Sequence, residues 1–337
     1  IVLIARILVI TSFLISVGSL ITYALNISVL YRNTVYSGNL FLGIGDTGAL
    51  YGLIGNSNRH CWLCILSMGF SFYLLLKTKK LLPSAFLTIN LLVQSAVIAL
   101  SQSRAGFIGL LVFSIIVIAN TLIVGHKNDT IPTKKKMAIV LLSCVLCVTP
   151  IFMEFFPQEI VDISQSTVIR TDEEKGRNVN ARFQMYQTGL QIVQDHPLLG
   201  VGGNDLKSLA KSYMPDDYSM KNSLFSDNFH DIFIQTAVQG GLIQLVVLLC
   251  AMAIPILHSI SALLKKKMPL GFGYLLSIAL SFLAINLVES ELYMARNFSA
   301  FSFWLILGWG LALCPPLKES KLLGLQKKLM PWTRKKS

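Results

Sequence analysis

Residues 81–124 read LLPSAFLTINLLVQSAVIALSQSRAGFIGLLVFSIIVIANTLIV, in which two apolar runs flank the short polar turn 101–104. A helix needs about 20 apolar residues to cross a bilayer, and each run has about that length. Lipid admits only helices or closed barrels, and barrel strands alternate apolar and polar residues over about 10 positions. The stretch therefore predicts two membrane-spanning helices joined by a turn.

The rest of the chain has the same character. Of its residues, 53% are hydrophobic and 14% are charged, whereas an ordinary globular domain has about 25% charged residues. This composition excludes an ordinary soluble protein, and it excludes intrinsic disorder because disordered chains are poor in apolar residues. We expect an all-α polytopic membrane protein with about eight transmembrane helices. The predicted spans are 3–30, 60–76, 81–100, 105–125, 137–155, 230–262, 269–288 and 298–314, with a break at Pro255 in the sixth.

The net charge of +12 could indicate a nucleic-acid partner, but the distribution of the charges indicates an orientation instead. Lysine clusters follow the second and sixth predicted spans, precede the fifth and fill the C-terminal tail, so all of them lie on one side of an alternating path. The positive-inside rule makes that side cytoplasmic. We therefore expect contact with anionic membrane lipids and no nucleic-acid partner.

One connection is much longer than the others. Residues 156–229 form a polar segment on the non-cytoplasmic side, and connections of this length are often functional. Asn180 is a possible cap for a helix within it, which the dipeptide His196-Pro197 would end. The apolar face of that helix has helical spacing: Phe183, Tyr186, Leu190 and Val193.

The spans and the long segment divide the chain into four predicted parts. These are a bundle of about five spans (1–155), a periplasmic loop with short helices (156–229), a bundle of about three spans (230–314) and a basic cytoplasmic tail (315–337). The first residues form an apolar span without an initiator Met, too long for a signal peptide. We therefore expect the chain to be truncated at its N-terminus.

Two motifs have a plain structural interpretation. The pairs Cys61/Cys64 and Cys144/Cys147 have the spacing of zinc ligands, but they lie in apolar spans and are interpreted as small packing residues. Residues 43–48 fit the dinucleotide-binding pattern GxGxxG, but they follow no predicted strand and are interpreted as a re-entrant or interfacial loop. The histidines have no metal-ligand spacing, so we expect neither a metal nor another cofactor.

Ionisable side chains at the edge of the membrane are functional candidates because burying them is costly. Three stand out by position: Arg104 in the turn between spans three and four, Arg182 in the long segment, and His230 at the head of span six. Each also has a structural alternative, namely an interfacial arginine, a solvated charge and a hydrogen-bonded histidine.

Two nearby sets of polar residues complete the picture of this side. Asp231, Gln235 and Gln239 follow His230 along one helix face, and we expect that face to line a groove or aqueous cavity. Glu289, Glu291 and Arg296 share the last outer turn, where we expect a local ion pair.

Two arginines and a histidine on one side suit transfer from a phosphate leaving group to a hydroxyl. Arginine forms bidentate contacts with phosphate oxygens and stabilises the departing charge. Histidine accepts a proton from a hydroxyl near neutral pH. The residue types thus favour group transfer from a phosphate to a hydroxyl.

The same residues resemble the O-antigen ligase and polymerase superfamily. Arg182 to Tyr186, followed by the run His196-Pro-Leu-Leu-Gly200-Val-Gly202, is similar to its RxxxW…HPLxGxG signature. His230, with Gly241 eleven residues later, resembles its H[NSQ]x9G motif, and residues 103–106 resemble its Ser-Arg-Gly turn. Three positions depart from the pattern: Tyr186 for Trp, Asp231 for Asn, Ser or Gln, and Gln244 for Gly.

The resemblance implies a glycosyltransferase of the bacterial inner membrane with its active site facing the periplasm. A ligase moves a glycan from undecaprenyl diphosphate to a sugar hydroxyl of lipid A–core, without metal or nucleotide. Arg104 and Arg182 would then hold the diphosphate, and His230 would act as the base or position the acceptor. The alternatives are an O-antigen polymerase, a protein-glycosylating ligase and, from another class, a transporter or flippase; the absence of an internal repeat disfavours the last.

Overall fold

The computed structural model describes residues 2–33, 38–44, 49–125, 132–152, 172–203, 206–215, 228–290, 292 and 298–313. Its helices are α1 (Val2–Ala24), α2 (Ser57–Lys77), α3 (Leu81–Leu100), α4 (Arg104–Ala119), continued by the π-helical η1 (Asn120–Val124), α6 (Thr133–Phe152), α8 (Asp172–Asp195), α9 (Leu206–Tyr213), α10 (Ile232–Leu264), α11 (Leu270–Ile285) and α12 (Phe298–Leu313). The strands are β1 (Ser28–Asn33), β2 (Gly38–Ile44) and β3 (Leu50–Gly52).

The predicted helical membrane fold is confirmed, and a helix occupies each predicted span. Five of these helices, α1, α2, α3, α4 with η1, and α10, are long and apolar enough to cross a membrane. Helices α11 and α12 are shorter and apolar, and α6 fills the fifth predicted span. The chain is a membrane protein.

The end of the first predicted span is wrong. Helix α1 ends at Ala24, and Asn26 has a φ of 53°, in the left-handed region that interrupts a right-handed helix. The chain then forms a three-stranded antiparallel sheet of order β1-β2-β3. Gly43 and Ile44 belong to strand β2, so the expected loop at the GxGxxG pattern is also wrong for these two residues; residues 45–48 lie outside the described part of the chain.

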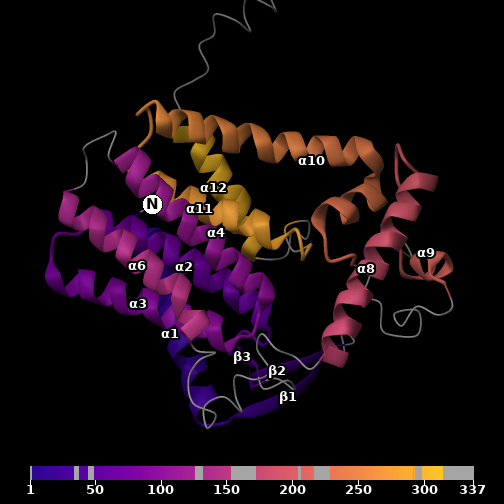
Figure 1. Cartoon of the computed structure of the whole chain (residues 1–337), viewed down its shortest axis with the longest axis horizontal. Helices are drawn as coiled ribbons and strands as arrows, with labels where there is room; N and C mark the ends of the chain where they lie inside the picture. The colour runs from indigo at the N-terminus through magenta and orange to yellow at the C-terminus, as the bar shows by residue number, and fades with distance from the viewer. Residues whose placement is uncertain are drawn as a thin grey trace, which may run out of the picture.

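The helices form a bundle around α2 and α11 (Figure 1). Helix α11 packs against α2, α4 and α12, while α1 and α3 flank α2, and α6 packs on α3 and α4. Most of α2 and α11 is buried, whereas α1 and α10 expose large apolar side chains such as Leu14 and Val247. An exposed apolar helix face is expected where lipid, not water, surrounds the protein.

Polar side chains connect α1, α2 and α3 in the interior of the bundle. Ser16 Oγ donates to Gln94 Oε1 (2.8 Å), whose Nε2 donates to Asn90 Oδ1 (2.9 Å). Asn90 Nδ2 in turn donates to the hydroxyls of Ser71 (2.8 Å) and Ser67 (3.0 Å). Interhelical hydrogen bonds of this kind hold membrane helices together because the hydrophobic effect does not act between helices in lipid.

Helix α10 is interrupted at Gly241, not at the predicted Pro255. Gly241 has a φ of 67° and a ψ of −172°, while the helix continues through Pro255. A proline removes one backbone hydrogen bond from a membrane helix, and neighbouring groups satisfy the backbone group that is left without a partner. Beyond Gly241 the remaining helix is roughly 34 Å long at 1.5 Å per residue, which matches the hydrocarbon core of a bilayer.

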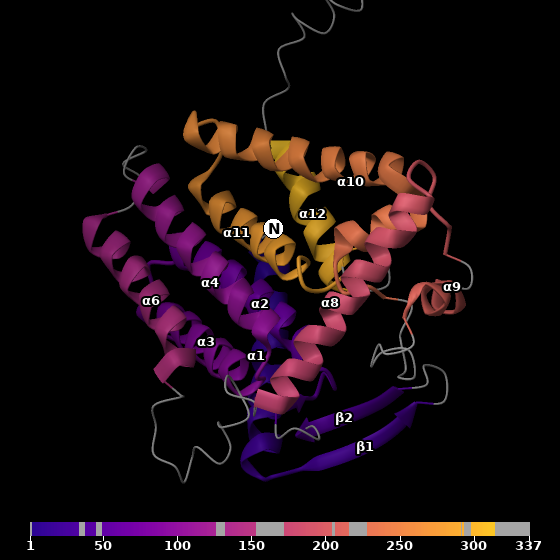
Figure 2. The same cartoon turned by 45° about the vertical axis from the view of Figure 1, so that its right-hand side comes forward.

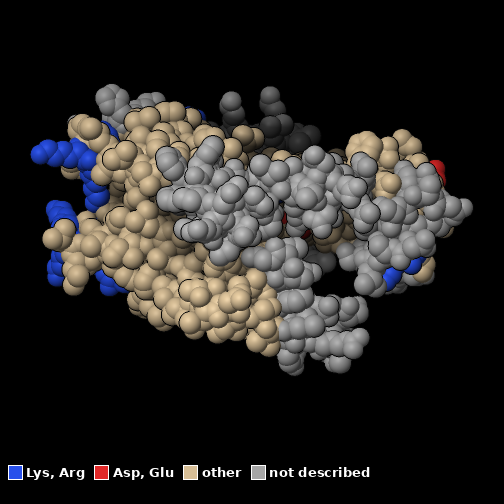
Figure 3. All heavy atoms as spheres, turned by 60° about the horizontal axis from the view of Figure 1, so that its bottom comes forward, with Lys and Arg blue, Asp and Glu red and all other residues tan. Residues whose placement is uncertain are grey.

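The two ends of the bundle differ in charge. The described lysines of the α2–α3 turn, the start of α6 and the α10–α11 turn gather at one end, which we call the basic end, at the left of Figure 3. They are Lys77, Lys79, Lys80, Lys134 to Lys136 and Lys265 to Lys267. At the opposite end α8 runs from beside the sheet towards α10 (Figure 2). The candidate site residues lie on α4, α8 and the start of α10.

Candidate active site

His230 lies just before α10 in an unusual backbone conformation. Its φ is 53°, which is uncommon for a residue other than glycine. Two contacts hold this conformation: the His230 amide donates to Asn228 Oδ1 at 2.7 Å, and the Tyr186 hydroxyl donates to the His230 carbonyl at 3.3 Å. Burial raises the pKa of the Tyr186 phenol, so this hydroxyl keeps its proton and remains a donor. Such over-determined backbone strain is typical of functional sites.

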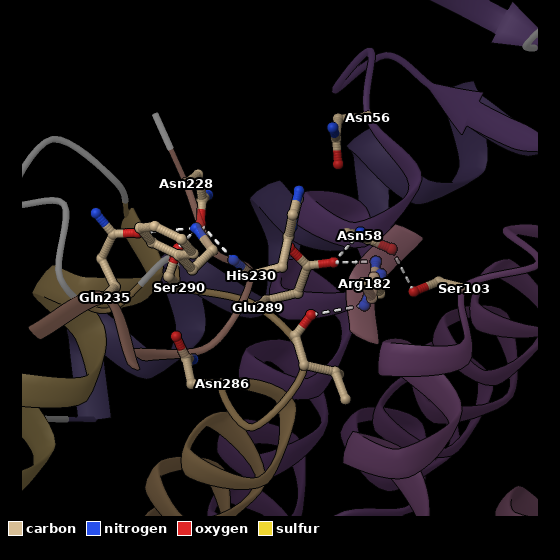
Figure 4. Close-up of polar contacts among 12 residues, drawn as sticks. Asn56, Asn58, Ser103, Arg182, Asn228, His230, Gln235, Asn286, Glu289 and Ser290 are labelled. Atoms are coloured by element: carbon tan, nitrogen blue, oxygen red, sulfur yellow. Dashed lines mark hydrogen bonds and ion pairs between the residues drawn. The ribbon is translucent and has the colours of Figure 1, made fainter. Parts of the chain in front are cut away.

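Glu289 lies at the centre of the site, between His230 and Arg182 (Figure 4). It follows the end of α11, and its side chain is only 6% exposed. Its Oε2 lies 3.1 Å from His230 Nδ1, and its Oε1 accepts from Arg182 Nη2 at 3.2 Å and from Asn58 Nδ2 at 2.9 Å. Arg182 Nη1 also donates to the Val288 carbonyl at 2.7 Å. One buried carboxylate therefore orients both a candidate base and a candidate phosphate ligand.

The backbone of α11 explains why Glu289 reaches His230. Asn286 caps α11, and its carbonyl accepts from the Ile232 amide at 3.1 Å. Its side-chain Oδ1 accepts from the Leu292 amide at 3.0 Å. These bonds tie the turn that carries Glu289 to the first residue of α10, two positions after His230.

The contact with Glu289 decides which nitrogen of His230 is available. A carboxylate only accepts hydrogen bonds, so Nδ1 carries the hydrogen that points at Glu289. Nε2 is then the unprotonated nitrogen of the neutral ring and can accept a proton from a substrate. The His230 side chain is 30% exposed, so this nitrogen belongs to a ring that solvent or substrate can reach.

A second chain of contacts connects Glu289 to the turn that carries Arg104. Ser103 Oγ donates to Asn58 Oδ1 at 2.6 Å, and Asn58 donates to Glu289. Ser103 is also the N-cap of α4 and accepts from the Gly106 amide at 2.9 Å. An added Cβ on Gly106 would lie 2.4 Å from Cys61 Sγ, so glycine permits the close packing of α4 against α2. Asn58 therefore links the Ser-Arg-Ala-Gly turn to Glu289. We call Glu289 with its partners His230, Arg182 and Asn58 the Glu289 network.

Arg104 itself is the first residue of α4 and is exposed. Its guanidinium forms no hydrogen bond or ion pair with a described residue. A positive charge at a helix N-terminus is unfavourable, because the amide groups there already carry partial positive charge. The same arrangement attracts an anion. The convergence of Arg104 with Arg182 and His230 on one cavity stays a prediction.

The glycine-containing segment that follows α8 (residues 196–202) binds α10 at its break at Gly241 and so holds α8 against α10. The break in α10 leaves backbone groups without helical partners, and the segment after α8 supplies partners for them. The amides of Val201 and Gly202 donate to the carbonyls of Val238 and Gln239, both at 2.9 Å, and the Leu242 amide donates to the Pro197 carbonyl at 2.7 Å. These backbone bonds fix the helix of Arg182 to the helix that begins after His230.

Gly241→Ala is expected to disrupt this joint. An added Cβ would lie 2.1 Å from the Leu198 carbonyl oxygen, and the φ of 67° is itself strained for alanine by about 1–3 kcal/mol. Because a misplacement of about 1 Å can lower a rate about 100-fold, we expect a large loss of activity with insertion in the membrane retained. The matched control is Gly308→Ala in α12, where an added Cβ meets nothing within 4 Å. Equal activity of the two variants would contradict the positioning role of the joint.

The structure corrects several expectations about the polar segment. Helix α8 begins at Asp172, so Asn180 lies inside it and is not its cap, while the predicted end at His196 is confirmed. Phe183 and Leu190 are 59% and 52% exposed, and Met185 and Ile192 form the buried face instead. The helical spacing is as predicted, but the helix buries a different face. Met185 and Ile192 face inward because they belong to the smaller of two clusters of buried apolar residues.

The polar stripe after His230 mainly satisfies the backbone. Asp231 is the N-cap of α10 and accepts from the amides of Phe233 and Ile234, both at 2.8 Å. Gln235 is buried, and its Oε1 accepts from the Phe229 amide at 2.9 Å. These contacts fix the backbone on either side of His230. Asp231 and Gln235 thus bond to backbone amides, whereas we expected them to line a cavity.

The remaining sequence predictions have mixed outcomes. Glu289 pairs with Arg182 and His230, whereas Glu291 and Arg296, its expected neighbours in a local ion pair, lie outside the described residues. Cys61 and Cys64 are buried in α2, and the Cys61 thiol forms a 3.0 Å hydrogen bond with Ser101 Oγ. Within the described part of the chain, no cluster of His, Cys, Asp and Glu could hold a metal ion.

Comparison with known proteins gives one family match. Residues 89–249 match the family model described as O-antigen ligase. Over these residues the chain is similar to the O-antigen ligase superfamily. The matched region includes Arg104, Arg182, His230 and Gly241, whereas Glu289 lies beyond it.

The chain is also distantly similar to a curated protein. An uncharacterized protein of Haemophilus influenzae is 22% identical over 207 residues, which cover 59% of this chain and 49% of the relative. The chain thus spans about half the length of that relative. The match to the O-antigen ligase model suggests a glycosyltransferase-type membrane enzyme.

Sequence reasoning missed Glu289 as the residue that joins the site. Its spacing to Glu291 excludes a carboxylate pair on one helix face, and its nearness in sequence to Arg296 favours a local ion pair instead. The useful signal is a carboxylate placed directly after an apolar span, where burial without a partner is costly. A buried carboxylate needs a cationic partner, but the sequence does not identify this partner, because Arg182 is far away in sequence.

Proposed function

We propose that this protein transfers a glycan from undecaprenyl diphosphate to a sugar hydroxyl of lipid A–core, at the periplasmic face of the bacterial inner membrane. The observation that carries the proposal is the contact of one buried carboxylate with both His230 and Arg182. The match of residues 89–249 to the O-antigen ligase model supports the reaction class. The long segment that carries Arg182, followed by a histidine at the head of a span, favours the ligase over the polymerase.

His230 acts on the acceptor in this proposal. Its Nε2 accepts the proton of the sugar hydroxyl while the hydroxyl oxygen forms a bond to the anomeric carbon of the glycan. Glu289 holds Nδ1 and stabilises the imidazolium that forms, as the carboxylate of a catalytic triad does. The proton then passes to solvent or to the departing diphosphate, which restores neutral His230.

The arginines act on the donor. The bond from the anomeric carbon to the phosphate oxygen breaks, and its electron pair leaves with the diphosphate. Arg182 is 39% exposed and uses only part of its donor capacity on Glu289 and Val288, so further N–H groups can bind phosphate oxygens. Arg104 supplies a second positive charge beside the N-terminal amides of α4. Because both charges are permanent, the mechanism needs no metal ion.

The orientation follows from the charges. With the basic end at the cytoplasmic surface, as the positive-inside rule requires, the Glu289 network faces the periplasm. A lipid-linked glycan and lipid A–core then both reach the site from the outer leaflet of the inner membrane. The C-terminal tail lies in the cytoplasm.

Arg104→Ala is expected to weaken donor binding without destabilising the protein. Arg104 is exposed and has no partner among the described residues, so its removal breaks no described contact. We expect a raised KM for the lipid-linked donor, a rate lowered by about 10-fold or more, and an unchanged melting temperature. Arg104→Lys should restore part of the activity, because lysine keeps the charge but loses the bidentate geometry. Wild-type kinetics of Arg104→Ala would remove this residue from the site.

Deletion of the gene tests the proposal and separates the ligase from the polymerase. Lipopolysaccharide of the deletion strain is run on a gel, and glycan on the lipid carrier is measured in parallel. The ligase proposal predicts lipid A–core that lacks the transferred glycan, and polymerised glycan that stays on the lipid carrier. A single repeat attached to core would identify a polymerase, and an unchanged ladder would contradict both.

A further inference from the structure

A cavity lies at the basic end of the bundle, on the side opposite to the Glu289 network. Helices α1, α2 and α3 enclose about 690 Å³ there. Its inner wall consists of apolar side chains, of which Val9, Leu74 and Leu87 are buried. Val2, Ile10 and Phe86 extend this wall outward. The cavity is thus apolar along the helices that cross the membrane.

The rim of the cavity is cationic. Arg6 on α1 and Lys77, Lys79 and Lys80 in the α2–α3 turn all line it. Lys135 of α6 reaches the same turn, where its Nζ donates to the Thr78 carbonyl at 3.3 Å. Among the described residues, no acidic side chain lines the cavity, and none of the four rim cations forms an ion pair.

This arrangement brings several positive charges close together, and a bound anion would reduce their mutual repulsion. Like charges at a membrane surface repel one another, and screening by salt is weaker where low-dielectric walls surround them. Basic pockets between membrane helices on the cytoplasmic side are typical sites for anionic lipid headgroups. A phosphodiester on the rim and an acyl chain along the apolar wall would fill both parts of the cavity at once, whereas a soluble anion would leave the wall exposed to water.

We propose that this cavity binds one anionic phospholipid of the cytoplasmic leaflet, with its phosphate among Arg6, Lys79 and Lys80 and an acyl chain against Val9, Leu74 and Leu87. The lipid joins the start of α1 to the α2–α3 turn. Because a ligand that binds only the folded state stabilises it, the lipid stabilises the packing of these three helices. The proposal does not depend on the glycosyl transfer proposed above.

The test uses the full-length protein, purified in a neutral detergent and supplied with single lipids. We expect phosphatidylglycerol to raise the melting temperature by several degrees and to remain bound through native mass spectrometry, with phosphatidylcholine and inorganic phosphate giving neither effect. The triple variant Arg6→Gln, Lys79→Gln, Lys80→Gln should lose both effects. The matched control, Lys265→Gln, Lys266→Gln, Lys267→Gln, removes as many charges from the same end outside the cavity and should keep them.

A second variant separates the cavity from general surface charge. Ile10→Trp narrows the cavity without changing any charge, since Ile10 lines it and is 49% exposed. We expect this variant to insert and fold but to bind phosphatidylglycerol at least 10-fold more weakly. Three results would overturn the proposal: equal stabilisation by phosphatidylcholine, equal losses in the control triple variant, or no bound lipid because another segment of the full chain occupies the cavity.

Discussion

His230→Ala is expected to lower the rate of glycan transfer by about 10²–10⁴-fold, the usual contribution of a general base. The protein should remain folded and inserted, because the His230 ring is partly exposed and its one hydrogen bond or ion pair with a described side chain is to Glu289. The expected change is in kcat, since the ring acts on the acceptor proton as the new bond forms. The measurement is the transfer rate of purified enzyme with a lipid-linked donor and a lipid A–core acceptor.

Two further variants separate the chemistry of His230 from its backbone. His230→Asn keeps a residue that tolerates the φ of 53° but has no basic ring nitrogen, so we expect it to be as inactive as alanine. His258→Ala removes a histidine from the other end of α10 and should keep wild-type activity. Substantial activity in His230→Asn would show that the histidine only shapes the chain and does not act as a base.

Glu289→Gln is expected to have an effect of similar size. In a catalytic triad, changing the orienting carboxylate to an amide lowers kcat by about 10⁴-fold, because the histidine adopts the wrong tautomer. Here the same change also removes the negative partner of Arg182. We expect a large fall in kcat, a smaller rise in the KM of the donor and a modest loss of thermal stability. Glu289→Asp should restore part of kcat.

A double-mutant cycle shows whether Glu289, Arg182 and His230 act as one unit. Residues that work together give strongly non-additive losses. The variant Glu289→Gln with His230→Ala should therefore be hardly slower than His230→Ala alone. Fully additive losses would indicate that Glu289 serves only the fold, through Arg182 and Asn58.

The membrane helices follow directly from the apolar runs of the sequence. Spans such as 81–100 coincide with the observed helix, since each peptide group in lipid must find its partner inside its own segment. The sheet β1-β2-β3 was not predicted, because residues 28–30 continue an apolar run whose interruption depends on the backbone at Asn26. Hydropathy is the same for a helix and a buried strand over so short a distance.

The site was predicted in part. Arg182 and His230 are residues whose charge is costly at the membrane edge, and the structure brings both to Glu289. Glu289 itself depends on a contact between residues more than 50 positions apart, which a single sequence does not reveal. The roles of Gly200 and Gly241 are also tertiary: an added Cβ on Gly200 would lie 2.5 Å from the Val238 carbonyl oxygen, and one on Gly241 would meet the Leu198 carbonyl oxygen. Each glycine makes room for the backbone of the other motif.

The most direct test of the account is reconstitution of the purified protein with a glycan on undecaprenyl diphosphate and with lipid A–core, followed by separation of the products. The account predicts glycan on lipid A–core and release of undecaprenyl diphosphate by the wild type, with both products formed about 10²–10⁴-fold more slowly by His230→Ala. Glycan that lengthens on the lipid carrier while lipid A–core stays unmodified would contradict the ligase reaction, and equal transfer by the His230→Ala enzyme would contradict the mechanism.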